Sequence, residues 1–525
     1  MDSKKKNDTG LSLLEKRKKS FLRVLFGRNA LLIFSLLLQA AILLAICFWF
    51  EDRIPLYLGG SALFTVLVLL ILVNSSMDPT AKITWLLIIS VLPVFGCIFY
   101  VWTQSEWGRR TLKALVARSE ALSHHLIAQE PEVLEKLTQE DPGVAGLSRY
   151  VASCGNFPVF TNTDVTYFPL GEDKWKAMLR ELEKAQSTIY LEYFIVREGV
   201  MWGKILEILV RKAQEGLDVR MLYDGTCEFT TLPYDYPKRI EKLGIRCKMF
   251  SPIEPLISSH YNYRDHRKIL VIDGCTAFTG GVNLADEYIN RLVRFGYWKD
   301  SGVRLEGPGA GALANIFLTF WKAQYPEEDI DIDRDLPAAA PVPTDCLVQP
   351  FADSPVDREA VAKNVYLELI NQAQRRLQIC TPYLILDNDL LACLRLAAKR
   401  GVDVRIYTPG VPDKPTIYQL TRSYFPHLLR AGVRIFSYTP GFLHAKTWLV
   451  DDRIAAVGTV NLDYRSLYLH FENSVLIYGG AVLDDVRRDL AEIERESAEV
   501  KLADCRTGFF GTMYSAVLRL VAPLC

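Results

Sequence analysis

The pattern of hydrophobic and polar positions divides the chain near residue 143. Before this point lie three apolar stretches without a charged residue: Leu31–Phe50, Leu56–Val73 and Ile83–Trp102. Each approaches the roughly 20 residues that a helix needs to cross a hydrocarbon core of about 30 Å. The pattern therefore predicts a membrane anchor of two to three transmembrane helices at 31–103. Basic residues flank this anchor at both ends, so the charge pattern leaves open which side of the membrane holds the rest of the chain.

Beyond residue 143, strand-like apolar runs alternate with amphipathic helical stretches, and the order of these elements repeats. In the first copy the four segments occupy 185–196, 205–225, 236–252 and 266–273. In the second copy they occupy 373–386, 390–410, 424–440 and 444–451. The repeat indicates a duplicated α/β unit, and its short crossovers predict two similar lobes with mainly parallel sheets flanked by helices.

An acidic and then Pro/Ala-rich stretch separates the two copies and is typical of an extended linker. The whole chain is therefore expected to contain a basic tail (1–30), the anchor (31–103), a juxtamembrane connector (104–142), a first lobe (143–325), a linker (326–345), a second lobe (346–505) and an apolar C-terminal segment (506–525). Duplicated lobes commonly face each other about a pseudo-twofold axis. That geometry would bring the ends of the two repeats together.

Each repeat ends in the same spaced set of polar residues. The first set is His266, Lys268, Asp273, Gly280, Gly281 and Asn283, and the second is His444, Lys446, Asp451, Gly458, Thr459 and Asn461. His and Lys two positions apart project from the same face of a strand. A single His on an apolar strand is usually a core residue, but two matching sets on matching lobes indicate chemistry.

These residue types suit the transfer of a phosphodiester group without metal or cofactor. Such a reaction needs cations for the anionic oxygens, an in-line nucleophile, and a proton for the departing alkoxide. Lys268 and Lys446 supply the cations, while one imidazole would attack phosphorus and the other would act as acid and then base. Asn283, Asn461 and Thr459 are candidate phosphate-binding groups.

The two aspartates of the motifs leave two alternatives open. Asp273 and Asp451 lie seven positions after the histidines, and this odd spacing places them on the opposite side of the strand pattern. They are candidate catalytic residues by their place in the motif. A structural role in holding the following turn is an equally good interpretation.

Composition narrows the class of partner further. The formal net charge is zero, which does not favour nucleic acid. The eleven cysteines lack CxxC pairs and nearby histidine clusters, which disfavours a structural zinc site. The expected partners are instead lipids of an anionic membrane, because the spans place the chemistry beside a bilayer.

Both motifs match the HxKxxxxD signature of the phospholipase D superfamily, which this chain resembles from about Tyr150 to its C-terminal region. The stretches NYRDHRKILVIDGCTAFTGGVNLADEYI and GTVNLDYRSLYLHFENS are similar to those of bacterial cardiolipin synthases, as is the apolar N-terminus. The resemblance implies two α/β lobes around one site, in an enzyme of the bacterial plasma membrane. It also implies a phosphatidyltransferase that joins two phosphatidylglycerol molecules into cardiolipin and releases glycerol.

The same resemblance suggests further roles. A carboxylate some thirty residues beyond each motif usually steadies a catalytic histidine in this superfamily, and the matching residues here are Asp300 and Glu472. Many members carry Ser or Thr at the position of Gly281, so the first lobe lacks the hydroxyl that Thr459 retains. Family habit favours His266 as the nucleophile.

Three other classes of function compete with this interpretation. A hydrolytic phospholipase D would carry the same motifs and differ only in excluding water less well. A phosphodiester nuclease is disfavoured by the apolar spans and by the lack of a strongly basic catalytic region. A membrane scaffold without activity has no chemical reason to keep both His and Lys pairs.

Overall fold

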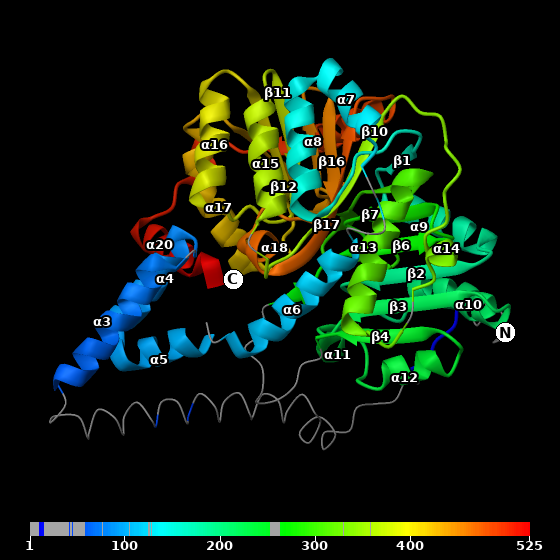
Figure 1. Cartoon of the computed structure of the whole chain (residues 1–525). Coiled ribbons are helices and arrows are strands. Elements are labelled where there is room, and N and C mark those ends of the chain that lie inside the picture. Colours follow the sequence, from blue (N-terminus) through cyan, green and yellow to red (C-terminus); the bar gives the residue numbers. More distant parts are fainter. Residues whose placement is uncertain are drawn as a thin grey trace, which may run out of the picture.

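The computed structural model describes residues 10–14, 41, 45, 58–75, 77–103, 106–123, 127, 129–251, 263–328, 330–357 and 359–524. Most of them form two α/β lobes that pack against each other (Figure 1). Each lobe is built on one large sheet, and the two sheets repeat the same strand order. The duplication in the sequence is therefore a duplication of architecture.

The first lobe holds a sheet of seven strands. In spatial order they are β1 (Asp164–Phe168), β9 (Gly302–Glu306), β7 (Thr276–Gly280), β6 (Lys268–Ile272), β2 (Thr188–Tyr193), β3 (Asp218–Asp224) and β4 (Arg246–Phe250). Strand β2 is buried along its whole length, as expected for a central strand.

The second lobe repeats this order with one strand more at its edge. Its strands are β10 (Leu347–Asp353), β17 (His470–Tyr478), β16 (Ile454–Gly458), β15 (Thr447–Val450), β11 (Arg376–Cys380), β12 (Asp403–Pro409), β13 (Arg434–Tyr438) and β18 (Ser497–Glu499). Strands β6 and β15, which follow the two histidines, occupy the same place in the two sheets.

The prediction of mainly parallel sheets is wrong, because both sheets are mixed. Within the two strand orders given above, the parallel pairs join β2, β3 and β4 in the first lobe and β11, β12 and β13 in the second. The strand that follows each histidine instead pairs antiparallel with its neighbours on both sides. The reason is loop length: only residues 273–275 join β6 to β7, and such a short connection allows a hairpin but no crossover.

Helices cover both faces of the sheets. The first lobe contains α9 (Gly171–Lys184), α10 (Val200–Gln214), α11 (Cys227–Thr230), α12 (Tyr236–Glu241), the 3₁₀ turn η3 (Asp286–Ile289) and α13 (Pro308–Gln324). The second contains α15 (Val361–Gln372), α16 (Asn388–Lys399), α17 (Pro415–Leu429), α18 (Tyr464–Tyr468) and α19 (Val482–Arg495). Helices α7 (Pro131–Glu140) and α8 (Pro142–Gly155) precede the first sheet, yet α8 packs beside α15 of the second lobe (Figure 1).

A hydrophobic core shared by both lobes lies between the two sheets. It includes Val303 and Phe317 of the first lobe and Val475 of the second, none of which is exposed to solvent. Helix α13 contacts β10 across this boundary, and α19 contacts β1 in the reciprocal way. Burial of this much apolar surface fixes the relative position of the lobes.

Two short strand pairs also cross from one lobe to the other. Strand β5 (Arg264–Asp265) runs parallel to the start of β17, and β14 (Gly441–Leu443) runs parallel to β8 (Tyr297–Lys299). Strands β5 and β14 each end directly before a motif histidine. The backbone that presents each histidine is therefore held by the other lobe.

The segment between the lobes, predicted as a linker, contains one short helix among its described residues. Its acidic portion contains the short helix α14 (Ile332–Asp335), and the buried Asp335 carboxylate lies 3.3 Å from the Arg220 guanidinium of the first lobe. Residues 336–345 form no helix or strand. The paired acid explains the difference, because a buried charge with a charged partner is part of a packed structure.

The apolar N-terminal region forms α3 (Leu58–Asn74), α4 (Pro79–Val91) and α5 (Pro93–Thr103), followed by α6 (Glu106–Ser123), which packs along α13. No helix among the described residues is long and apolar enough to cross a membrane. The predicted span Ile83–Trp102 is divided at Leu92 between α4 and α5, because Pro93 lacks the N–H that would continue the first helix. The predicted span Leu31–Phe50 lies outside the described residues apart from two positions.

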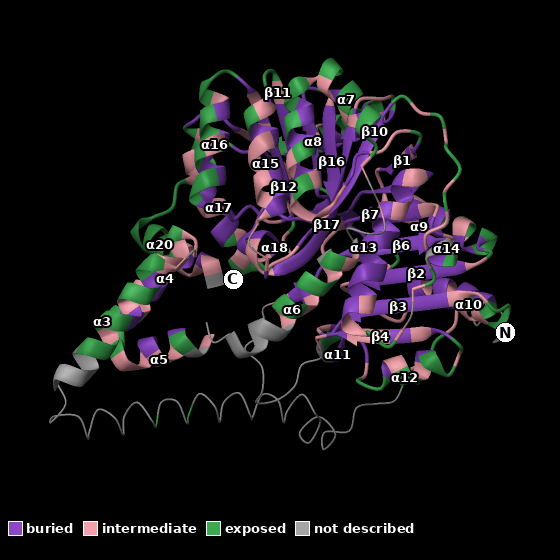
Figure 2. Cartoon of the chain, in the orientation of Figure 1, coloured by how far each residue is buried: buried purple, intermediate pink, exposed green. Residues whose placement is uncertain are grey.

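The C-terminal helix α20 (Phe509–Val521) fastens this region to the second lobe. It packs against α17, and the Thr84 hydroxyl of α4 donates a hydrogen bond to the Leu520 carbonyl. The chain continues from the 3₁₀ turn η4 (Leu502–Cys505) before α20 to η5 (Ala522–Leu524) after it. Helices α3 and α4 extend away from the two lobes and are largely exposed on their outer side (Figure 2).

The motif aspartates hold the turns after β6 and β15. Asp273 accepts hydrogen bonds from the backbone N–H groups of residues 186–188, and Asp451 from those of residues 374–376, at 2.7–2.9 Å. Both residues adopt a left-handed backbone conformation, with φ of 49° and 53°. Each carboxylate therefore anchors the start of the neighbouring strand, β2 or β11.

This arrangement predicts that Asp451 acts on stability rather than on the chemistry. We expect Asp451→Asn, which removes one charged acceptor, to lower the free energy of unfolding by about 1–3 kcal/mol in a denaturant titration. The specific activity of the folded fraction should stay within about threefold of the wild type. The control is Asp452→Asn at the next, exposed position, which has a similar φ of 57°. A 100-fold loss of activity at unchanged stability would instead assign Asp451 to the reaction.

Candidate active site

His266 follows β5 and faces a carboxylate of the other lobe. Its Nδ1 atom lies 2.9 Å from each of the two Glu472 oxygens, and its backbone N–H donates to the Phe471 carbonyl at 2.9 Å. Glu472 is buried in β17. With Nδ1–H donated to this carboxylate, the lone pair of the imidazole resides on Nε2.

His444 repeats this arrangement in the opposite direction. Its Nδ1 lies 2.6 Å from Asp300 Oδ2 of the first lobe, and its backbone N–H donates to the Lys299 carbonyl at 2.7 Å. Asp300 is fully buried and also accepts from the Ser301 N–H. Each histidine thus takes its carboxylate from the other lobe, so neither lobe alone contains a complete pair.

Polar contacts next to these pairs repeat the same exchange between lobes. The Ser301 and Thr447 hydroxyls lie 2.8 Å apart, and the Asn473 amide donates to the Thr279 hydroxyl at 2.8 Å. All four side chains are buried. They link the two sheets next to the two histidine–carboxylate pairs.

Both motif lysines are buried beside the histidines. The Lys268 ammonium donates to the His266 carbonyl, and the Lys446 ammonium donates to the His444 carbonyl at 2.6 Å. Lys446 Nζ also lies 3.0 Å from both ring nitrogens of His444. The structure thus brings together the two histidines, two lysines and two carboxylates that the sequence singles out.

The position after the motif glycine differs between the lobes. The Thr459 hydroxyl is fully buried and donates to Glu472, the carboxylate that faces His266. At the matching Gly281, a Cβ atom would lie 2.0 Å from Asp300 Oδ1, so the carboxylate itself occupies that space. Gly281 therefore lacks a hydroxyl because Asp300 lies directly against its backbone. Thr459 contacts Glu472, the carboxylate of the His266 pair.

The two motif asparagines are placed differently. Asn283 accepts from the Ile195 N–H at 3.0 Å and donates to the Tyr288 hydroxyl at 2.8 Å, so both ends of its amide are engaged. The Asn461 Oδ1 atom is buried and has no hydrogen-bond partner among the described residues. Asp273 and Asp451 are not brought to the histidines, because each lies at the far end of the five-residue or four-residue strand that follows them.

Sequence reasoning missed a set of rings around the histidines. The His470 ring lies 5.3 Å from the His266 ring, and the Trp298 ring lies 5.3 Å from the His444 ring. His470 and Trp298 each precede a carboxylate, Glu472 or Asp300, by two residues. That i, i+2 spacing on a strand was the available signal, because such residues share one face. Phe194, Tyr288 and Phe442 complete the set.

Burial sets the charge state of the histidines. It lowers the pKa of His266 well below the usual range, and burial together with Lys446 lowers the pKa of His444 to about 4. Burial alone would raise the pKa of Glu472, but His266 beside it holds that pKa below the usual value. At neutral pH the free site therefore holds neutral imidazoles that donate to ionised carboxylates.

Burial also lowers the pKa of Lys268 to about 7 and that of Lys446 to about 8. Each lysine lies near enough to the other lobe for the charges to interact, since Lys446 lowers the pKa of Lys268 and Lys268 lowers that of His444. An anion that binds between the lysines would relieve this repulsion. The electrostatics therefore favour a bound phosphodiester.

One trio among the described residues could offer ligand atoms to a metal ion: His266, His470 and Glu472. Two of its three members form the His266–Glu472 pair. A metal bound at this trio through Nδ1 of His266 would replace the hydrogen bond to Glu472. The positions of these three residues are therefore explained by the hydrogen bond between His266 and Glu472 at least as well as by a bound metal ion.

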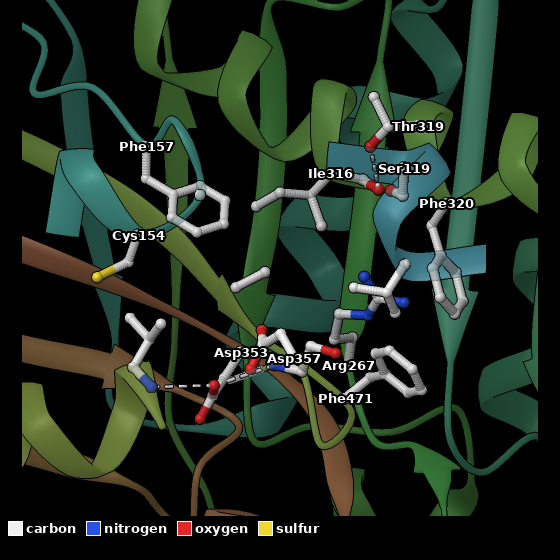
Figure 3. Close-up of a pocket in the computed structure, with 15 residues that line it drawn as sticks. Ser119, Cys154, Phe157, Arg267, Ile316, Thr319, Phe320, Asp353, Asp357 and Phe471 are labelled. Carbon is white, nitrogen blue, oxygen red and sulfur yellow. Dashed lines mark hydrogen bonds between the residues drawn. The ribbon is translucent and has the colours of Figure 1, made fainter. Parts of the chain in front are cut away.

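A cavity of about 70 Å³ lies on the reverse side of the strand that carries the first motif. Arg267, between His266 and Lys268, reaches into it beside Phe320 (Figure 3), with its guanidinium 4.0 Å from the centre of the Phe320 ring. The same guanidinium pairs with Glu192 and Asp265. The cavity lining contains no motif His or Lys. It is therefore separate from the site of the paired histidines.

Two histidines and two lysines from duplicated lobes, with carboxylates exchanged between the lobes, define a phospholipase D-like protein. The family model described as "Cardiolipin synthase, PLD-like domain" matches residues 178–293 and 366–493. A protein named cardiolipin synthase from Halalkalibacterium halodurans is 32% identical over 95% of this chain and 99% of its own length. The chain belongs to the cardiolipin synthase family, as the sequence predicts.

Other relatives agree with this assignment. A protein of Streptococcus mutans described as uncharacterized is 47% identical over 87% of this chain and 99% of its own length. Among solved structures, a phosphatidylserine synthase from Haemophilus influenzae matches 72% of this chain and 98% of its own with a TM-score of 0.55. Its sequence identity is 17%, so this likeness shows the fold alone.

The exchanged carboxylates generate a prediction for both lobes. Glu472→Gln and Asp300→Asn should each lower kcat by about 10²–10⁴-fold, because the neutral amide no longer fixes the tautomer or stabilises a charged imidazole. Steady-state kinetics of the purified full chain would measure this. The matched control is Glu492→Gln on the exposed side of α19, which should retain full activity. Activity within threefold of the wild type in either site variant would contradict the pairing.

The lysines predict an alkaline limit of activity. They are cationic below their pKa values of about 7 and about 8, so kcat/KM should fall as pH rises through this range. The physical reason is that a neutral lysine no longer compensates the anionic phosphodiester oxygens. Enzyme held at pH 9 and returned to pH 7 should recover fully, which separates titration from denaturation. A kcat/KM that stays constant up to pH 10 would contradict the assignment.

Proposed function

We propose that this protein is a cardiolipin synthase that transfers a phosphatidyl group between two phosphatidylglycerol molecules and produces cardiolipin and glycerol. The observation that carries the proposal is the pair of buried histidines, each hydrogen-bonded to a carboxylate of the opposite lobe and each accompanied by the buried lysine of its own motif. This set supplies a nucleophile, an acid and phosphate-binding cations. The product, cardiolipin, follows the names of the relatives, and the choice of phosphatidylglycerol follows the family resemblance of the sequence.

The first step forms a covalent intermediate. Nε2 of His266 attacks phosphorus, a P–N bond forms, and the bond from phosphorus to the glycerol headgroup oxygen breaks. His444 in its protonated form gives its proton to that oxygen, and glycerol leaves. Binding of the anionic phosphodiester favours the protonated form of His444, whose pKa is low in the free site.

The second step consumes the intermediate. The terminal hydroxyl of a second phosphatidylglycerol attacks phosphorus, and His444, now neutral, takes its proton. The P–N bond breaks, cardiolipin leaves, and both histidines return to their starting state. Glu472 stabilises the cationic phosphohistidine throughout, since the ring keeps its Nδ1–H.

The assignment of His266 as the nucleophile has support in the contacts. The described residues make no hydrogen bond to its Nε2, whereas Nε2 of His444 lies 3.0 Å from the Lys446 ammonium. A cation this close to both ring nitrogens withdraws electron density from the imidazole and makes it a weaker nucleophile. His444 therefore suits the acid and base role better.

We also place the enzyme on an anionic bacterial plasma membrane. The outer side of α3 and α4 exposes large apolar residues such as Ile71 and Leu87, and α20 exposes Phe509 and Phe510 at 75% and 85% of their surface. Helix α20 is also amphipathic, and Arg519 lies on its inner side against Tyr424. Such a helix lies in the headgroup region of a bilayer, next to the lipid substrates.

The proposal predicts a metal-independent product pattern. Purified full-length protein in phosphatidylglycerol vesicles with EDTA should release one glycerol for each cardiolipin, as measured by mass spectrometry. His266→Ala and His444→Ala should each lose activity by at least about 10³-fold. His427→Ala, on α17 outside the site, serves as the control. Phosphatidic acid as the sole product would support a membrane-bound phospholipase D that hydrolyses phospholipid instead.

A further inference from the structure

The two catalytic histidines stand in matching places, but their surroundings differ in polarity. Beside His266 lie the Phe194 ring at 4.9 Å and the polar ring of His470 at 5.3 Å. At the place that matches His470, the first lobe carries Trp298, 5.3 Å from the His444 ring. At this pair of matching positions, one half of the site therefore carries a polar ring and the other an apolar one.

His444 lies against three aromatic rings, which we call the aromatic wall: Tyr288, Trp298 and Phe442. Their ring centres lie 5.5, 5.3 and 5.7 Å from that of His444. The rings also contact one another, with Trp298 4.7 Å from Tyr288 and 4.8 Å from Phe442. All three side chains are at least nine-tenths buried. Two come from the first lobe and one from the second.

The wall contains one polar atom without a partner. The indole N–H of Trp298 is buried and makes no hydrogen bond within the described part of the chain. A buried donor of this kind costs free energy unless a ligand accepts from it. The hydroxyl oxygen of an alcohol is a suitable acceptor, and the carbon backbone of a polyol can pack on aromatic rings.

We propose that the aromatic wall binds the alcohol, first the leaving glycerol headgroup and then the glycerol of the acceptor lipid. In this proposal Trp298 determines how the intermediate divides between transfer to the alcohol and transfer to water. The inference rests on the proposed function, in which His444 exchanges a proton with this alcohol. Two reactions compete for the phosphohistidine. An alcohol hydroxyl gives a phosphodiester, and water gives phosphatidic acid; in both, the P–N bond breaks and His444 takes the proton.

The wall favours the first reaction in two ways. Three packed rings offer water few hydrogen bonds, so a water molecule next to His444 is poorly held. The indole N–H and the ring faces instead hold an alcohol with its hydroxyl toward His444. Trp298 is thus a positioning residue, and its effect should appear in the ratio of products rather than in the total rate alone.

The test is the partition of the intermediate in Trp298→His, which introduces the residue type of the other half. Full-length protein in phosphatidylglycerol vesicles is assayed for glycerol, cardiolipin and phosphatidic acid. Glycerol measures formation of the intermediate, and the other two measure its fate. We expect the ratio of phosphatidic acid to cardiolipin to rise by about tenfold or more. Trp298→Phe, which keeps an aromatic ring but removes the donor, should raise the ratio by about threefold.

Two controls separate this role from a structural one. His470→Trp changes the matching position beside His266 and should leave the ratio within twofold of the wild type, whatever its total rate. Trp448→Phe alters a buried tryptophan that stacks on Tyr366 at 4.3 Å and should also leave the ratio unchanged. If Trp298→His lowers both products in equal proportion, the wall is only structural and the inference is overturned.

The test also remains informative if one variant folds poorly or the proposed function fails. Tyr288→Phe removes only a hydroxyl and probes the same wall. We expect its ratio of phosphatidic acid to cardiolipin to lie between those of the wild type and Trp298→His. An unchanged ratio in every wall variant would refute the inference. Wild-type protein that releases glycerol but makes only phosphatidic acid would refute the synthase function itself. That outcome is seen before any substitution is made, so the two failures are distinguishable.

Discussion

The structure depends on one constraint: each buried imidazole faces a carboxylate that belongs to the other lobe. Glu472 reaches His266 and Asp300 reaches His444, at 2.9 and 2.6 Å. A buried ionised carboxylate is costly without a hydrogen-bonded partner, so separation of the lobes would leave both acids uncompensated. Two further features hold the lobes at the distance that these hydrogen bonds require. They are the strand pairs β5–β17 and β14–β8, which join the lobes, and the hydrophobic core that both lobes share.

Duplication provides the charges twice, and small departures from symmetry give the two halves different tasks. Thr459 supports Glu472 through its hydroxyl, while Gly281 makes room for Asp300. Lys446 contacts both nitrogens of His444, whereas no residue in the described part of the chain makes a hydrogen bond to Nε2 of His266. His470 and Trp298 then make one side polar and the other aromatic. A nucleophile and an acid can thus arise from one ancestral motif through changes in their neighbours.

The sequence predicted what depends on spacing. Identical intervals in the two motifs placed His266 and Lys268 on one face and revealed the duplication, and family resemblance supplied Asp300 and Glu472. The sequence did not predict which lobe supplies the carboxylate of each histidine, because the pairing depends on contacts between residues 144 and 206 positions apart. The antiparallel pairing of β6 was missed because hairpins and crossovers share one hydrophobic pattern. The rings of His470 and Trp298 act through packing, which spacing alone does not show.

In the proposed reaction, one histidine of the two-lobed site carries the phosphatidyl group covalently while the other moves the proton. The most direct measurement uses His444→Ala protein and a phosphatidyl ester of p-nitrophenol, a leaving group that needs no protonation. After an alkaline quench, peptide mass spectrometry locates the phosphatidyl group. We expect release of one p-nitrophenol per site and a modified His266. A modification at any other residue, or full release of p-nitrophenol without any modified histidine, would contradict it.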